Sequence, residues 1–143
     1  AAMNRAIAAI EVQGLDIIAQ SDVFETPPVG TVRQPKFANM VVAVKGSVSP
    51  AQLLRMVKRI ERAAGRRSGL RWGPRPLDID LIAYDDLAVA APELTLPHPR
   101  LFERAFVLVP LAEIAGERII AGIRVDDALA RLDRSGIERL SPR

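Results

Sequence analysis

Apolar positions along the chain follow helical and strand periods in turn, and loops rich in proline and glycine separate them. The expected elements, in order, are a helix at 2–13, strands at 16–24 and 37–45, a helix from Pro50 to Gly65, a strand at 77–84, helices at 101–115 and 125–132, and an edge strand in the tail. The stretches 25–36, 65–76 and 91–100 are expected to be loops. Pro110 should kink or divide its helix, because proline lacks a backbone donor.

The helix that follows Ser49 has the clearest start signal in the chain. Ser49 suits the N-cap, Pro50 suits the first helical position, and Gln52 completes a capping box. Gly65 is expected to end this helix. Its buried stripe should consist of Leu53, Val57, Ile60 and Ala64.

The order of elements indicates the α+β class, and specifically a ferredoxin-like α/β sandwich with helices on the faces of a mostly antiparallel sheet. Such a split β-α-β fold has a strand before its first helix. The helix at 2–13 has no N-cap residue. We therefore expect that the first strand is missing from this sequence.

The length and composition are those of a single globular domain spanning 1–143. Hydrophobic residues make up 49% of the chain, and no apolar run is long enough to cross a bilayer. There is no cysteine, which excludes disulfides and thiolate metal sites. No signal peptide is visible, so we expect a cytoplasmic protein without a membrane partner. The net charge of +3 suggests an anionic ligand.

The segment "RWGPRPLDID" contains the strongest candidate for chemistry. Asp78 and Asp80 alternate with aliphatic residues, so both carboxylates point to one face of the strand. They would stand about 6–7 Å apart, and their repulsion favours a bound cation. Mg²⁺ accepts one or two carboxylates together with phosphate oxygens. The alternative is a solvent-facing strand whose charges serve solubility.

Arginines precede this pair in a glycine-containing loop, and a guanidinium binds phosphate oxygens in a bidentate manner. Cations beside metal-binding carboxylates are typical of a polyphosphate site, although a solvated loop would have the same composition. His98, held between two prolines, either contacts phosphate or is merely exposed. Trp72 either stacks on a base or anchors the loop by burial. The arginines concerned are Arg66, Arg67, Arg71 and Arg75.

Asn39 is a polar residue within an apolar strand, so its amide must find a partner. It would bond either the facing backbone or a flat heterocycle. The preceding "TPPVG" offers carbonyl groups beside prolines that cannot donate, which suits an aminopyrimidine-like edge. Phe37 and Phe106 form either stacking walls or part of the core.

Four stretches, "ETPPVG", "QPKFANMVVAV", "RWGPRPLDIDLIAY" and "LTLPHPRLFERAFVLVPLAEIA", closely resemble the 6-hydroxymethyl-7,8-dihydropterin pyrophosphokinases of the folate pathway. The resemblance runs through 1–115 and continues more weakly to the C-terminus. It implies an Mg²⁺-dependent enzyme that transfers pyrophosphate from ATP to the hydroxymethyl group of the pterin and releases AMP. It also implies small-molecule partners, no nucleic acid and a monomer.

The resemblance further implies a role for each matching residue. Asp78 and Asp80 would hold two Mg²⁺ ions, and Arg66 and Arg75 would join them in catalysis. The residues expected to contact or enclose ATP are Glu61, Arg71, Trp72, Arg75, Thr95, His98 and Arg104. Those expected to form the pterin pocket are Thr26, Pro27, Val29, Phe37, Asn39 and Phe106.

In two respects the sequence departs from the family pattern. Nothing matches the family's first strand, and the loop "GRRSGLRW" is about one residue short, which leaves open whether Arg66 or Arg67 fills a given role. Two other functions compete with the enzyme. A non-catalytic ligand-binding domain would have lost a carboxylate or an arginine, and both sets are present. An RNA-binding domain would interleave aromatic and basic residues on a strand, and this chain does not.

Overall fold

The computed structural model describes residues 2–26, 37–68 and 77–140 of the chain. All strand pairs in this part are antiparallel, and with the helices they confirm the α+β class. The elements are α1 (Ala2–Val12), β1 (Asp16–Gln20), β2 (Phe24–Thr26), β3 (Phe37–Asn39), β4 (Val42–Lys45), α2 (Pro50–Ser68), β5 (Val89–Ala91), β6 (Leu94–Leu96), the 3₁₀ turn η1 (Leu101–Glu103), α3 (Ala105–Ala115), β7 (Ile119–Ile120), β8 (Ile123–Arg124), α4 (Val125–Ala130) and β9 (Glu138–Arg139).

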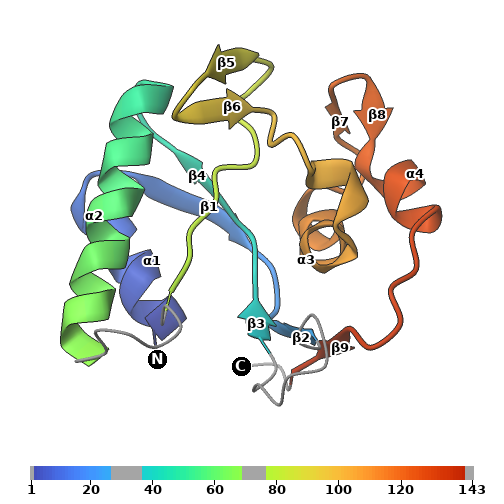
Figure 1. Ribbon diagram of the computed structural model, residues 1–143, viewed down its shortest axis with the longest axis horizontal. Coiled ribbons are helices and arrows are strands. Elements are labelled where there is room, and N and C mark those ends of the chain that lie inside the picture. The colour runs from blue at the N-terminus through green and yellow to red at the C-terminus, as the bar shows by residue number, and fades with distance from the viewer. Residues whose placement is uncertain (1, 27–36, 69–76, 141–143) are drawn as a thin grey trace.

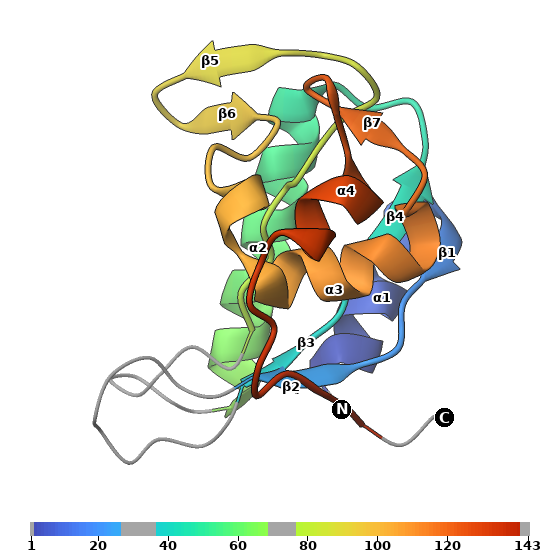
Figure 2. The ribbon, with the colours of Figure 1, turned by 90° about the vertical axis from the view of Figure 1, so that its right-hand side faces the viewer.

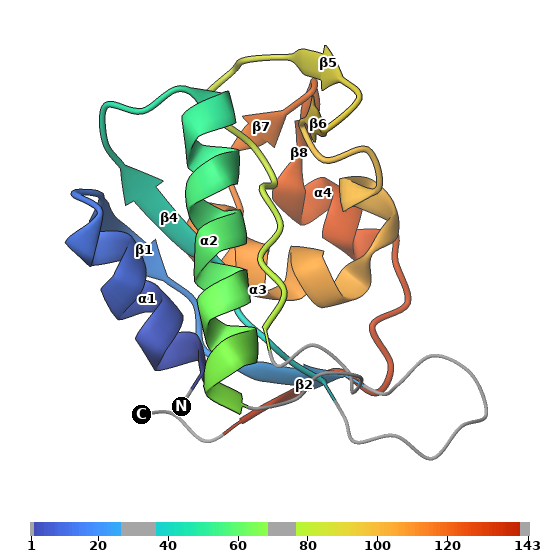
Figure 3. The same cartoon turned by 60° about the vertical axis from the view of Figure 1, so that its left-hand side comes forward.

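The β1–β4 pair lies between two helical layers (Figures 1 and 3). Helices α1 and α2 cover one side, where Ala6, Ile10, Met56 and Ile60 form a buried cluster with Leu15. Helices α3 and α4 lie on the other side around a second buried cluster. None of the described helices has the length and hydropathy that crossing a bilayer requires.

The strands predicted at 16–24 and 37–45 are each divided in two. β1 pairs with β4, and β2 pairs with β3, so the four pieces form one bent hairpin. At the bend the Ser21 hydroxyl accepts the Val41 N–H at 2.9 Å in place of a ladder bond. A register shift between Ile17 and Ala19 also bends the pair. The predicted loop at 25–36 starts too early, because Glu25 and Thr26 belong to β2.

The capping box at the start of α2 is confirmed. The Gln52 N–H donates to Ser49 Oγ at 3.1 Å, and the Ser49 N–H donates to Gln52 Oε1 at 2.8 Å. The predicted end at Gly65 is wrong, since α2 continues to Ser68. Glycine ends a helix when it adopts a left-handed conformation, and Gly65 is not among the described residues with positive φ. Gly14, which follows α1, does adopt one, with φ of 94°.

The predicted strand at 77–84 is extended but has no strand partner in the described part of the chain. Its alternation is nevertheless present: Leu77 and Ile79 pack against the cluster under α1 and α2, whereas Asp78 and Asp80 are exposed. Burial of the aliphatic side chains therefore orients this segment without a hydrogen-bonded ladder.

The stretch predicted as a loop at 91–100 contains part of a hairpin, in which β5 pairs with β6. This hairpin stands at one end of the molecule (Figure 2). The predicted helix at 101–115 is divided, but at Arg104 and not at Pro110. Arg104 has extended torsions, φ −114° and ψ 95°, which separate η1 from α3. Pro110 lies inside α3, where it is buried.

The C-terminal strand β9 pairs with the edge of β2, as expected for the tail. Arg139 on β9 forms ion pairs with Asp22 and with Glu113 of α3. Its guanidinium carbon lies 4.9 Å from the centre of the Phe24 ring. Hydrogen bonds to Glu113 and Asp22 raise the pKa of Arg139 above its ordinary value, so this contact remains cationic. The tail thus ties β2 to α3. Helix α4 confirms the helix predicted at 125–132, and the β7–β8 hairpin before it was not predicted.

Candidate functional site

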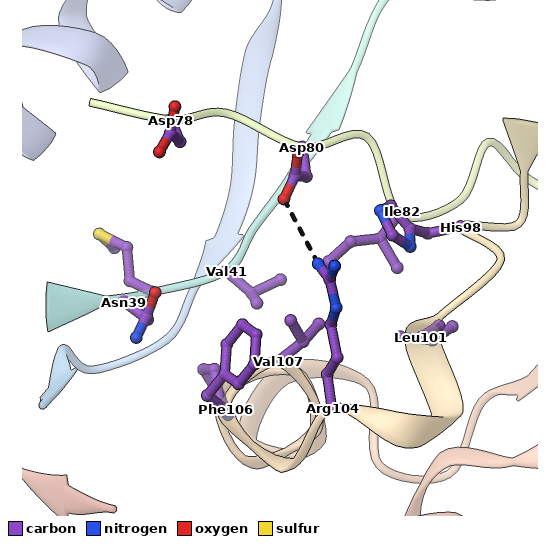
Figure 4. A pocket seen from close by; sticks show the side chains of 12 residues that line it. Asn39, Val41, Asp78, Asp80, Ile82, His98, Leu101, Arg104, Phe106 and Val107 are labelled. Carbon is purple, nitrogen blue, oxygen red and sulfur yellow. Dashed lines mark ion pairs between the residues drawn. The ribbon is translucent and has the colours of Figure 1, made fainter. Parts of the chain in front are cut away.

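A pocket lies where the extended 77–84 segment, the end of β3 and the start of α3 meet (Figure 4). Its volume is about 100 Å³, smaller than a typical small-molecule cleft, so a ligand bound here would extend beyond it. Six residues singled out from the sequence line it together: Asn39, Asp78, Asp80, His98, Arg104 and Phe106.

Asp78 and Asp80 reach this pocket because the aliphatic residues between and beside them are drawn to the opposite side. Both residues are exposed, so their oxygens are accessible to a ligand. No three histidine, aspartate or glutamate side chains within the described ranges are grouped to hold a metal. Two carboxylates alone suit Mg²⁺ that also takes phosphate oxygens and water.

Arg104 points toward Asp80 from the junction of η1 and α3 (Figure 4). Its Nη1 lies 3.9 Å from Asp80 Oδ2, a long contact worth little by itself. The guanidinium carbon is also 5.6 Å from the centre of the Phe106 ring. The pocket therefore contains both a cation and two exposed carboxylates. In a metal polyphosphate, the metal ion would match the carboxylates and the phosphate oxygens would match the guanidinium.

His98 is held at the rim by two backbone contacts. The backbone N–H of His98 donates to the Ile82 carbonyl at 2.7 Å, and the imidazole Nδ1 accepts the backbone N–H of Arg100 at 3.1 Å. In the neutral imidazole an accepting Nδ1 leaves the proton on Nε2. His98 is therefore oriented to donate a hydrogen bond from Nε2.

Asn39 enters the pocket from the end of β3. Its Nδ2 donates to Thr26 Oγ1 at 3.0 Å, across the β2–β3 pair. Thr26 is only 6% exposed, so its hydroxyl is held in place by the surrounding residues and in turn orients the Asn39 amide. The Asn39 side chain carries a second N–H and a carbonyl oxygen, which suit a flat heterocycle with both donors and acceptors.

Two of the residues expected near ATP lie outside this pocket. Glu61 is buried on α2, and Thr95 is exposed on β6; neither lines the pocket. For Arg66 and Phe37 the structure describes the backbone alone, in α2 and β3. The predicted residues Pro27, Val29, Arg71, Trp72 and Arg75 fall outside the described ranges.

The sequence did not single out the apolar floor of the pocket. Val41 continues from β3, and Leu101, only 1% exposed, begins η1. Their sequence signal was ordinary hydrophobicity, which does not distinguish a pocket floor from core. The apolar lining consists of Met40, Val41, Ile82, Leu101, Val107 and Pro110.

The sequence matches a known family model. Residues 1–116 match the model described as 7,8-dihydro-6-hydroxymethylpterin-pyrophosphokinase. The matched range contains every residue that lines the pocket.

Curated relatives agree with this match. A 2-amino-4-hydroxy-6-hydroxymethyldihydropteridine pyrophosphokinase of Methylorubrum extorquens is 48% identical over 127 residues, which cover 89% of this chain and 80% of that protein. The Bacillus subtilis protein of the same name is 38% identical over 117 residues, 82% of this chain and 67% of that protein. A mitochondrial folate synthesis bifunctional protein of Arabidopsis thaliana is 41% identical over 106 residues, 74% of this chain and 19% of the plant protein.

Proposed function

The chain belongs to the 7,8-dihydro-6-hydroxymethylpterin-pyrophosphokinase family, and from this premise we propose how its residues perform the reaction. The activity is that of a pyrophosphokinase in folate biosynthesis, which transfers pyrophosphate from ATP to the pterin hydroxymethyl group and releases AMP. The observation that carries the proposed mechanism is the convergence of Asp78, Asp80, Arg104 and Asn39 on one pocket.

Asp78 and Asp80 are proposed to hold two Mg²⁺ ions together with the ATP phosphates. Their exposure, their common side of the segment and the nearby Arg104 support this assignment. When bound, the ions would offset phosphate charge and polarise the substrate hydroxyl, which lowers the need for a strong protein base.

Arg104 and His98 are proposed to hold the phosphate chain against this carboxylate pair. Arg104 offers a planar fork of donors, and His98 offers Nε2–H. The proposal extends to residues whose side chains the structure does not describe: Arg66 and Arg75 in catalysis, and Arg71 and Trp72 over the nucleotide. Thr95, exposed on β6, is proposed to contact the nucleotide outside the pocket.

Asn39 and Phe106 are proposed to bind the pterin. The amide, oriented by Thr26, would bond the donor and acceptor edge of the ring, and the Phe106 side chain would pack on its face. Pro27, Val29 and Phe37 are proposed to complete this pocket.

The reaction needs no covalent intermediate on the protein. The hydroxyl oxygen of the pterin attacks the β-phosphorus and gives its proton to solvent water, while the bond from that phosphorus to the bridging oxygen of the α-phosphate breaks and AMP leaves. The proposed contribution of this chain is alignment and charge stabilisation: Asn39 fixes the pterin, while Arg104 and the carboxylate pair fix the phosphates.

For the fold we propose a single ferredoxin-like domain whose sheet includes the 77–84 segment. Leu77 and Ile79 share a cluster with Ile17 of β1 and Val44 of β4, so all three segments bury residues under α1 and α2. In the described part of the chain, β4 pairs only with β1 and the 77–84 segment pairs with no strand. A further strand between β4 and the 77–84 segment would pair with both.

Product analysis tests the proposed function. The protein is incubated with ATP, Mg²⁺ and 6-hydroxymethyl-7,8-dihydropterin, and AMP is then resolved from ADP. Pterin-dependent AMP without release of inorganic phosphate is expected, because the β-phosphorus is the one attacked. ADP as the product would refute the proposed alignment. Binding of Mg·ATP without any product would instead indicate a non-catalytic binding domain.

Asn39→Ala is expected to weaken pterin binding about tenfold, because it removes hydrogen bonds worth about 1.4 kcal/mol from a buried ligand. ATP affinity, measured by calorimetry on the same variant, should change less than about twofold. The nucleotide thus serves as the internal control for folding. An equal loss for both ligands would contradict the assignment of Asn39 to the pterin.

A further inference from the structure

The two carboxylates stand on a backbone segment that no strand ladder holds within the described part of the chain. Burial of Leu77 and Ile79 determines which side chains of the segment face the pocket. It constrains sliding of the segment along its own axis less strongly. At the far end the backbone N–H of His98 donates to the Ile82 carbonyl at 2.7 Å, and the Tyr84 hydroxyl donates to the Val48 carbonyl. Both of these bonds lie beyond Asp80, so a contact to the backbone between Asp78 and Asp80 would fix the position of the carboxylate pair more directly.

Glu61 on α2 supplies that contact. Its Oε2 accepts the Ile79 N–H at 2.6 Å, and its Oε1 lies 3.3 Å from Lys58 Nζ. Glu61 is only 8% exposed and follows Val57 by one helical turn, so it sits beside the buried stripe of α2. A buried carboxylate that accepts a backbone N–H makes a charge-assisted bond, which is stronger than a neutral one.

The N–H that Glu61 accepts belongs to the residue between the two carboxylates. Holding this peptide restricts the backbone torsions on both sides, and these torsions set where Asp78 and Asp80 point. Glu61 itself does not line the pocket, so the described geometry gives it no contact with a ligand there.

We propose that Glu61 is a positioning residue that, through its bond to the Ile79 backbone, holds the Asp78–Asp80 pair in the geometry that binds the metal. This inference rests on the proposed function only in taking the pair to be a metal site. It assigns the bond between helix α2 and the Ile79 backbone a role in metal affinity.

The test measures metal binding without turnover. Mn²⁺ is titrated into the full chain in the presence of the non-transferable analogue α,β-methylene-ATP, and free Mn²⁺ is followed by electron paramagnetic resonance. Glu61→Ala is expected to weaken Mn²⁺ binding about 10- to 100-fold, the usual effect of losing a group that orients a ligand. Glu61→Gln should restore most of the affinity, because its amide oxygen still accepts the Ile79 N–H.

Lys58→Met is the matched control, because it removes the cation beside Glu61 and leaves the bond to Ile79. Its Mn²⁺ affinity should stay within about twofold of the unmodified protein. Hydrogen exchange at the Ile79 amide, followed by NMR, should be faster in Glu61→Ala and slow again in Glu61→Gln. The Ile79 amide reports the bond itself, and unchanged slow exchange at amides of the other helices establishes that the alanine variant remains folded.

Mn²⁺ affinity within twofold of the unmodified protein in Glu61→Ala would overturn the proposal. So would a loss of metal-free nucleotide binding with the Mn²⁺ site intact, which would make Glu61 a nucleotide contact. If the protein forms no AMP, yet its Mn²⁺ affinity depends on Glu61 as described, the proposed function fails and the positioning role stands.

Discussion

Asp80→Asn is expected to lower kcat/KM for AMP formation by at least about a hundredfold. The amide keeps the size of the side chain but cannot supply the negative charge that a hard cation requires. Apparent Mg²⁺ affinity should fall with the rate, and excess Mg²⁺ should restore only part of it. Coupled AMP assays over a range of Mg²⁺ concentrations measure both.

The fold of the Asp80→Asn variant should be unchanged, because the side chain is exposed and its contact with Arg104 is long. Removing one of two like charges should leave the melting temperature equal or slightly higher. Asp86→Asn is the matched control: it makes the same chemical change just beyond the same segment, at an exposed turn position away from the pocket. Near-native turnover in Asp80→Asn would disprove the metal assignment.

Leu108→Ala is expected to lower the free energy of unfolding by about 2–5 kcal/mol. Leu108 is fully buried in the cluster that α3 forms with α4, so truncation leaves a cavity that the packed neighbours fill only partly. The melting temperature should fall by about 2–4 °C for each kcal/mol lost. Urea denaturation followed by circular dichroism measures the change.

Leu87→Ala makes the same substitution at a side chain that is 48% exposed, and it should cost less than about 0.5 kcal/mol. Leu108 does not line the pocket, so the folded fraction of Leu108→Ala should keep its kcat. A loss comparable to that of Leu87→Ala would show that the α3–α4 cluster does not carry the stability assigned to it.

Local patterns in the sequence determined the features that depend on neighbouring residues. The Ser49–Gln52 capping box is an exchange of bonds between residues three apart, so the sequence predicted it correctly. The orientation of Asp78 and Asp80 follows from the alternation of aliphatic and acidic residues, and burial of Leu77 and Ile79 enforces it. Residue type identified Asn39 as a candidate, whereas Arg104 was identified by the family resemblance.

Only the tertiary structure decided the features that depend on distant partners. The bend at Ser21 comes from its bonds to Val41, and strand propensity carries no information about that contact. Arg104 leaves the helical conformation where η1 turns into α3, a boundary that no helix-breaking residue marks.

The bond made by Glu61 is a second contact that the sequence pattern could not predict. The helical period places it beside a buried stripe, yet its bond to Ile79 spans 18 residues and arises only when α2 packs against the extended segment. Periodicity determines which side chains share a face, because it depends on torsions within one element. Which backbone groups those side chains meet is decided when separate elements pack together, and that depends on the whole chain.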